Sequence, residues 1–177
     1  MPRLLFVRHT AVELLDGVPP RDWPVTEEGR RAAERLARDP IWRALAHVAT
    51  SPEGKAVETA RPLARAAELA PRVDDDLREV ARELPVLPRA EYVALVTRWL
   101  DGEDVPGFEP REHAARRFAA AVDRAAAASP GPTAVVTHGL VLALHLGLTP
   151  DEWTALPLPG IAAVVESPDP GYQRASP

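Results

Sequence analysis

The stretch Leu4-Leu5-Phe6-Val7-Arg8-His9 decides the fold, because it is a short apolar run that ends on a basic pair. A run of this kind, bounded by polar residues, predicts a buried strand over residues 3–8. Two further apolar runs cover residues 47–50 and 133–137, and the second of them leads into His138. Functional residues gather outside the carboxyl ends of such strands in open α/β sheets. These strand ends therefore predict where the chemistry of the molecule lies.

Helical patterns separate the strand candidates along the chain. Helix starts are indicated by Thr26 and Ser51, which are residue types that cap helices, and by the acidic residues that follow them. The expected strands cover 3–8, 47–50, 72–73, 133–137 and 161–166, and the expected helices run from Thr26 to about Asp39, from Ser51 to about Leu69, over 111–128 and from Thr149 onward. Alternating strands and helices predict an α/β fold with three layers, in which a mostly parallel sheet carries helices on both faces.

The length of 177 residues is sufficient for one domain with a substantial core. No linker and no shift in composition divides the chain, so we expect a single domain over residues 1–166. The segment 167–177 contains three prolines and is expected to be a flexible tail.

Composition and charge exclude several classes of protein. The net charge of −5 gives no support for nucleic-acid binding, which favours a basic surface. The chain has no cysteine, which excludes disulfides, thiolate catalysis and cysteine-bound metals. No spacing of His, Asp and Glu indicates a metal site, and no cofactor is expected. No apolar run approaches the roughly 20 residues that span a bilayer, and no signal peptide precedes the first strand, so we expect a cytoplasmic protein without a membrane partner.

His9 is joined near the predicted strand ends by two basic residues, Arg8 and Lys55, and by a second histidine, His138. Lys55 is the only lysine among the 21 Lys and Arg residues. A phosphoryl group needs positioned positive charge, because charge on its oxygens must be offset during transfer. Gly139 follows at a predicted helix start, where free N–H groups also favour an anion. Together these residues predict a pocket for a phosphoryl group.

The same positions carry motifs that follow one another in a fixed order. They are Arg8-His9-Thr10, Asp22 to Arg30 (DWPVTEEGR), Ser51 to Ala60 (SPEGKAVETA), Leu77-Arg78-Glu79 and Thr137-His138-Gly139. In these motifs the chain resembles the histidine phosphatase superfamily, also called the phosphoglycerate mutase-like family. The resemblance extends in order over residues 3–166, and it implies the same α/β fold and a phosphatase-type activity.

The resemblance also implies a role for each matching residue. His9 is the implied nucleophile, which forms a phosphohistidine that water then hydrolyses. A histidine suits this role because an ordinary pKa of about 6.5 leaves it largely neutral at pH 7. Glu79 is the implied general acid for the leaving oxygen, with Glu83 as the alternative. The resemblance assigns Arg8, Lys55 and His138 to phosphate binding, and His138 is also expected to be catalytic. From the residues themselves we expect Thr10 and Gly139 to line the same pocket.

The chain departs from the family pattern at four positions. Lys55 stands where the family has arginine, and a lysine offers a point charge in place of a planar fork. Thr10 replaces a glycine, so its side chain either crowds the pocket or lends it a hydroxyl. Val12 and Leu15 stand at positions where the family has Thr and Asn, which removes two polar contacts.

The leading hypothesis is a metal-independent phosphomonoester hydrolase. A mutase is not expected, because family mutases carry an inserted segment that this chain lacks. The alternatives are a protein phosphohistidine phosphatase and a degenerate, non-catalytic phosphate-binding domain. The expected partner is a phosphorylated small molecule or a phosphoprotein. Specificity is expected to lie in residues 10–24 and 84–110. The patterns of these segments do not identify the substrate, and the sequence does not indicate the oligomeric state.

Overall fold

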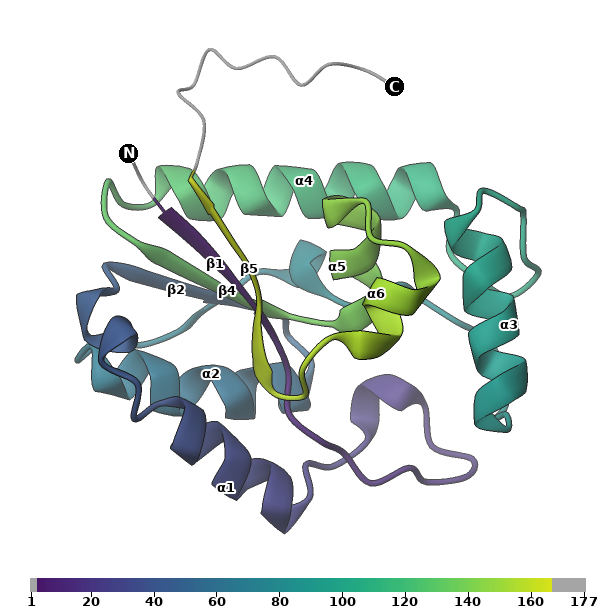
Figure 1. Ribbon diagram of the computed structural model, residues 1–177, viewed down its shortest axis with the longest axis horizontal. Helices are drawn as coiled ribbons and strands as arrows, with labels where there is room; N and C mark the ends of the chain where they lie inside the picture. Colours follow the sequence, from purple (N-terminus) through teal and green to yellow (C-terminus); the bar gives the residue numbers. More distant parts are fainter. Residues whose placement is uncertain (1–2, 167–177) are drawn as a thin grey trace.

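A five-stranded sheet forms the centre of the molecule (Figure 1). The computed structural model describes residues 3–166, so the predicted tail 167–177 lies outside the described residues. The strand order is β3 (Arg72–Val73), β2 (His47–Thr50), β4 (Thr133–Thr137), β1 (Arg3–Arg8) and β5 (Gly160–Glu166). The first four are parallel, and β5 pairs with β1 in the antiparallel direction. The expected mostly parallel sheet is thus confirmed.

Strand β1 shows how the apolar runs build the core. Leu4 and Phe6 pack into the core on one face of the sheet, and Leu5 and Val7 pack into the core on the other. Successive side chains of a strand point to opposite faces, so a strand that is covered on both faces is a continuous apolar run. Each such side chain stabilises the fold by about 1.5–3 kcal/mol when it is fully buried.

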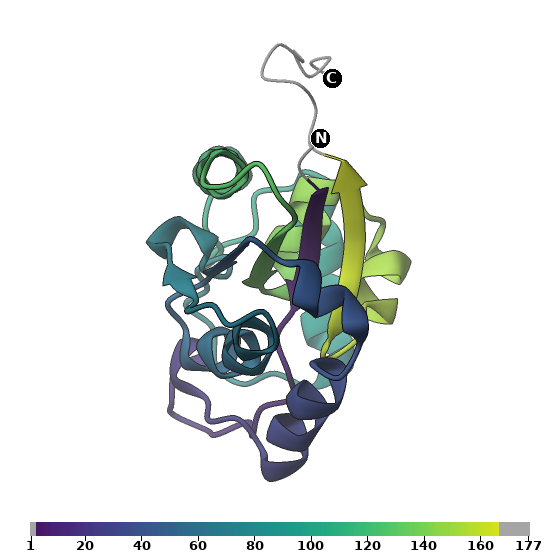
Figure 2. The same ribbon diagram turned by 90° about the vertical axis from the view of Figure 1, so that its left-hand side faces the viewer.

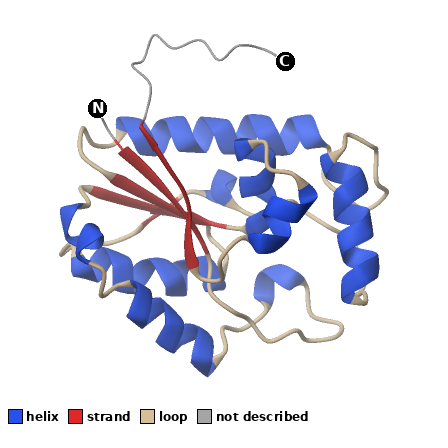
Figure 3. Ribbon diagram, viewed as in Figure 1, coloured by secondary structure: helices blue, strands red, loops and turns tan. Residues whose placement is uncertain are grey.

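Helices cover both faces of the sheet (Figure 3). On one face lie α1 (Glu27–Leu36), α2 (Gly54–Ala66) and the short 3-10 helix η2 (Pro40–Ala44). On the other lie α3 (Arg89–Leu100), α4 (Arg111–Ala127), α5 (Gly139–Leu146) and α6 (Pro150–Ala155). Figure 2 shows the same layers after a turn of 90°, with α4 seen end-on above and the α1–α2 pair below.

Two helices differ from the sequence expectation at their ends. Helix α1 ends at Leu36 instead of about Asp39, because Pro40 forces the residue before it out of the helical region. Helix α2 begins at Gly54 instead of Ser51, whose hydroxyl is hydrogen-bonded to His138. At its other end α2 stops at Ala66, where Glu68 adopts the left-handed conformation (φ 58°) and the Leu69 N–H donates to the carbonyl of Ala64.

The sequence analysis did not predict α3. Of its residues only Val96 and Trp99 are buried, so the helix presents a narrow apolar stripe that periodicity does not reveal. The helix matters for function because it lies within the segment 84–110, where specificity is expected.

The carboxyl ends of β1, β2 and β4 lie at one edge of the sheet. In register, Arg8 pairs with Thr137, and Thr50 pairs with Val136. The residues that follow these strands therefore come together, as the sequence predicts.

Candidate active site

His9 follows β1 and is held in one tautomer. Its Nδ1 lies 2.6 Å from the carbonyl oxygen of Thr10, which can only accept, so Nδ1 carries the proton and Nε2 keeps the free lone pair. Burial holds the pKa of His9 well below its usual value, and electrostatic coupling to His138, Lys55 and Arg8 lowers it further. The ring is therefore neutral at pH 7, with Nε2 available for attack.

His138 follows β4 and is fully buried beside His9, with 5.0 Å between the ring centroids. Its Nε2 lies 2.7 Å from the Ser51 hydroxyl oxygen and 3.5 Å from Oε1 of Glu53. Burial lowers the pKa of His138 to about 3, although the Glu53 charge opposes that shift. At pH 7 His138 is thus a neutral hydrogen-bonding group, and the positive charge of the site comes from Arg8 and Lys55.

The lone lysine is part of the site and not a surface residue. Only 5% of the Lys55 side chain is exposed, and Nζ donates to the carbonyl oxygen of Pro20 at 2.6 Å. The same Nζ lies 2.7 Å from Oε2 of Glu53, whose side chain is also buried. Burial alone would raise the pKa of Glu53, but electrostatic coupling to His138 and the charge and hydrogen bond of Lys55 lower it to about 2. A carboxylate therefore stands inside the predicted phosphate pocket.

The sequence analysis missed Glu53. It took the residue as part of a helix start, whereas the residue precedes the helix and its Oε1 accepts the backbone N–H of Glu79. The available signal was an acidic residue two positions before the single lysine. That spacing places the side chains together only when the first residue lies outside the helix.

Arg8 and Gly139 meet at the start of α5. The Arg8 Nη1 donates to the carbonyl oxygen of Leu156 at 3.0 Å, while its buried Nε has no hydrogen-bond partner among the described residues. A Cβ on Gly139 would lie 3.0 Å from that Nε. The glycine thus permits the guanidinium to lie against the helix start. Burial lowers the pKa of Arg8 from its usual value, but the guanidinium remains charged.

Glu79 lies against the N-terminus of α5. Its Oε1 accepts the N–H groups of Val80 and Val141 at 2.9 Å, and its Oε2 accepts that of Leu140 at 3.1 Å. The free N–H groups that the sequence predicted for an anion are thus bonded to this carboxylate. Glu83 does not lie one helical turn later, because the segment is extended and its N–H donates to the Gly107 carbonyl.

Thr10 does not direct its hydroxyl to a phosphate. The side chain is fully buried, and Oγ1 donates to the carbonyl oxygen of Gly29 at 2.7 Å. Its backbone N–H donates to Oγ1 of Thr59 in α2. Thr10 therefore fixes the chain after His9 to the helices below the sheet.

Arg82 is a second residue that the sequence analysis missed. Its side chain is 14% exposed, and its Nη1 is buried without a hydrogen-bond partner among residues 3–166. That nitrogen lies 3.9 Å from Oε2 of Glu79, which is an ion-pair distance but too long for a hydrogen bond. The positive charge of Arg82 also contributes to the lowered pKa of His138. Nothing in the pattern of residues 80–88 indicated this placement.

The described residues contain neither a metal-binding cluster nor a helix that could span a membrane. In the described part of the chain, no group of three His, Cys, Asp or Glu side chains could hold a metal ion. No helix between residues 3 and 166 has the length and apolar character that crossing a membrane requires.

A neutral histidine with a fixed tautomer, set between an arginine, a lysine and a second histidine at the edge of an α/β sheet, defines an enzyme of the phosphoryl-transfer class. The family model of the histidine phosphatase superfamily (branch 1) matches residues 4–166, so the chain belongs to this superfamily. Within that class it is a phosphatase.

Comparison with solved structures agrees with the family assignment. A structure described as mycobacterial hydrolase 1 is 25% identical, with a TM-score of 0.73 over 97% of this chain and 92% of the other. The mycobacterial glucosyl-3-phosphoglycerate phosphatase is 26% identical, with a TM-score of 0.71 over 93% and 88%. YhfR of Bacillus stearothermophilus is 23% identical with a TM-score of 0.71 over 93% and 89%, and shows the shared fold. A search of curated proteins gives no significant match.

Proposed function

We propose that the protein is a metal-independent phosphomonoester hydrolase that acts through a phosphohistidine on His9. The observation that carries this proposal is the hydrogen bond from His9 Nδ1 to the Thr10 carbonyl, because it leaves the Nε2 lone pair free in a neutral ring. Arg8 and Lys55 supply positive charge beside that ring, and His138 supplies a buried hydrogen-bonding group.

In the first step Nε2 of His9 attacks phosphorus, an N–P bond forms and the bond from phosphorus to the ester oxygen breaks. The leaving oxygen takes a proton, for which Glu79 is the proposed donor.

In the second step water attacks the phosphohistidine. The water oxygen forms a new bond to phosphorus and gives a proton to Glu79, while the N–P bond breaks and the electron pair returns to Nε2. The products are the alcohol and inorganic phosphate, and no metal or oxidant takes part.

The solved relatives support a small phosphorylated substrate. The mycobacterial glucosyl-3-phosphoglycerate phosphatase has been determined with inorganic phosphate and with VO3. At 26% identity over 93% of this chain, it supports the same class of substrate here. We propose the cytoplasm as the location, on the sequence grounds given above.

The test is turnover of phenyl phosphate in the presence of EDTA. Wild-type protein is expected to hydrolyse it, and His9→Ala is expected to abolish turnover because the phosphoryl acceptor is removed. His47→Ala is the matched control, because His47 lies at the other end of β2 and outside the site. Protein quenched during turnover of labelled substrate should carry an acid-labile phosphate on His9. An active His9→Ala enzyme would refute nucleophilic catalysis by this residue.

One observation favours the alternative of a non-catalytic phosphate-binding domain. Glu53 already pairs with Lys55, so the pocket contains an anion of its own. Phosphate binding without turnover in the wild type would select that alternative.

A further inference from the structure

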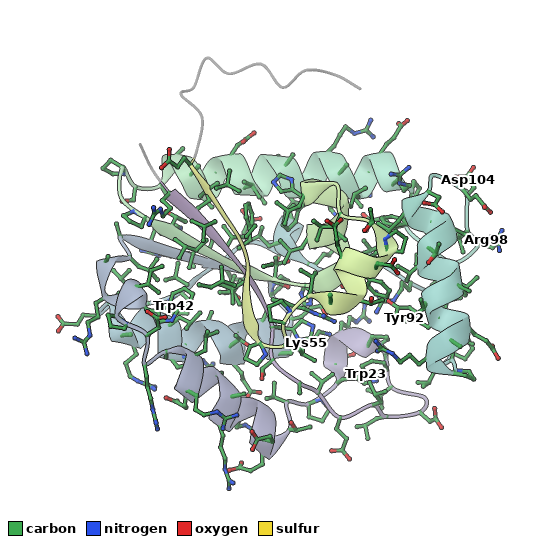
Figure 4. All side chains as sticks on the ribbon, viewed as in Figure 1. Trp23, Trp42, Lys55, Tyr92, Arg98 and Asp104 are labelled. Atoms are coloured by element: carbon green, nitrogen blue, oxygen red, sulfur yellow. The ribbon has the colours of Figure 1, made fainter. Side chains whose placement is uncertain are left out.

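A cavity of about 750 Å³ opens beside the catalytic residues. Its walls come from two segments that are far apart in the sequence, residues 14–23 and residues 82–92. Figure 4 labels Trp23, which lies on the first of these walls, and Tyr92, which lies on the second. Both walls overlap the segments 10–24 and 84–110, in which specificity is expected from the sequence, although Arg82 precedes the second of them.

Two contacts and two longer-range electrostatic interactions join the cavity to the catalytic residues. The carbonyl of Pro20, on the first wall, accepts a hydrogen bond from Lys55. Arg82, on the second wall, lies 3.9 Å from the carboxylate of Glu79. Tyr92 and Arg89 of the same wall act electrostatically on Arg8. A phosphate ester bound at His9 would therefore place its alcohol part in this cavity.

The walls are mainly apolar. The apolar side chains on the two walls are those of Leu14, Val18, Trp23, Leu84, Val86 and Leu87. Leu14 is 61% exposed although it is a large apolar residue, so the mouth of the cavity presents apolar surface to solvent. Surface of this kind marks a ligand-binding groove, and it favours an apolar alcohol part over a sugar or a glycerol.

The charged residues of the walls are unbalanced. Three are arginines (Arg21, Arg82 and Arg89), against the single acid Glu83. Arg21 is largely exposed and pairs with Asp22, and Arg89 is exposed. Arg82 is the buried one, and a guanidinium with an unpartnered buried N–H is costly unless a ligand satisfies it.

The surroundings of Arg82 hold it ready for an anion. Its guanidinium carbon lies 5.2 Å from the centroid of the Tyr92 ring, so the ring supports the planar group. Burial raises the pKa of Tyr92 from its usual value, so the phenol stays protonated. A guanidinium fork suits a carboxylate or a second phosphate.

We propose that the substrate is a phosphomonoester whose alcohol part is apolar and carries a second anionic group, and that Arg82 binds this group in the cavity between residues 14–23 and 82–92. The proposal rests on the proposed function, because the ester must place its phosphate at His9. It adds the chemical class of the alcohol part, and it assigns Arg82 to specificity.

The test compares phenyl phosphate with 4-carboxyphenyl phosphate and with hydroquinone bisphosphate. For wild-type protein we expect the carboxylated ester to have a kcat/KM at least about tenfold higher than phenyl phosphate, as a hydrogen bond to a charged group implies. Arg82→Gln should remove that preference, chiefly through KM. Arg98→Gln is the matched control, because Arg98 lies on α3, is exposed and pairs with Glu103 away from the cavity (Figure 4). The bisphosphate distinguishes a site for any anion from a site for carboxylate.

The outcomes separate this proposal from the proposed function. Wild-type hydrolysis of phenyl phosphate without any preference for the anionic esters overturns the cavity proposal alone. Equal losses for all three esters in Arg82→Gln also overturn it, because Arg82 would then act on the transferred phosphoryl group. Calorimetric titration of the same esters and of glycerol 3-phosphate into His9→Ala protein measures their affinities without turnover. We expect the two anionic esters to bind more tightly than phenyl phosphate and glycerol 3-phosphate. Equal affinity for all of them would contradict the proposal there too.

Discussion

Two buried ion pairs lie near the catalytic edge of the sheet, and they are built in different ways. The guanidinium of Arg117 donates twice to Glu109, at 2.8 and 2.7 Å, and also to the carbonyls of Asp76, Arg78 and Glu79. All five N–H groups of that arginine are therefore used. Lys55 has two contacts within the described residues, to Glu53 and to Pro20, which leaves one of its three N–H groups for a ligand.

The difference separates a structural pair from a functional one. The Arg117–Glu109 pair holds the segment that carries Glu79, and the Glu109 carboxylate also accepts the N–H of Ala81. Nothing in that pair is available to a substrate. The Lys55–Glu53 pair lies beside His138, and an incoming phosphate can compete with Glu53 for both partners. The Arg117 pair is complete, because every N–H group of its cation is used, and it holds a segment in place. The Lys55 pair is incomplete, because one N–H group is left over, and it can exchange partners with a ligand.

Breaking the complete pair should have the largest effect. Arg117→Met removes both guanidinium hydrogen bonds to the buried Glu109 and leaves three carbonyls without this donor, so the free energy of unfolding is expected to fall by about 3–5 kcal/mol. Urea unfolding measures this loss. Arg116→Met is the control, because Arg116 is exposed and lies 4.0 Å from its ion-pair partner Glu112. Equal stability of the two variants would contradict a structural role for Arg117.

Breaking the incomplete pair should have a smaller effect on stability and an opposite effect on binding. Glu53→Gln removes the charged partner of Lys55, so the unfolding free energy is expected to fall by about 1.5–3 kcal/mol. Phosphate and vanadate should bind about tenfold more tightly, because no internal carboxylate competes for Lys55. Isothermal titration of phosphate measures the second effect. Glu58→Gln is the control, since Glu58 lies on α2 and pairs with Arg30 at the surface. Weaker phosphate binding in Glu53→Gln would show that Glu53 supports the ligand.

Low pH should destabilise the protein through His138, the buried histidine beside the Lys55–Glu53 pair. The pKa of His138 is about 3 in the folded protein, so below about pH 6.5 the unfolded chain binds a proton that the folded chain does not. Stability is therefore present above that pH and is lost as the pH falls, by about 2 kcal/mol at pH 5. His138→Asn should reduce this loss when unfolding is measured at pH 7 and pH 5 in a buffer free of phosphate. An unchanged pH dependence in the variant would show that His138 is charged in the folded protein.

Breaking an exposed pair on α4, the helix that also carries Arg117, should have the smallest effect on stability. Arg124 pairs with Asp74 and Asp76 at 2.8 Å and is half exposed. Arg124→Gln is expected to lower the unfolding free energy by only about 0.2–1 kcal/mol, and the difference should diminish in 1 M salt. Thermal unfolding at low and high salt tests both points. A loss as large as that of Arg117→Met would mean that burial does not distinguish the two pairs.

The sequence predicted the sheet and the catalytic edge because both follow from local patterns. The apolar runs before His9 and His138 correspond to β1 and β4, and the single lysine lies in the site. The contact of Glu53 with Lys55 could not be predicted, since it depends on the exact residue at which α2 begins. The burial of Arg82 could not be predicted either, because it depends on loops that meet only in the folded chain.

The place of β1 in the sheet has a consequence for the order in which the protein folds. Its neighbours are β4 and β5, and Leu4 pairs with Thr133 on one side and with Val165 on the other. During synthesis the strand that leads to His9 therefore emerges well before β4 and β5, the two strands with which it pairs. Because contacts between distant residues form slowly, catalytic activity should return only with the final phase of refolding, after the helices have formed.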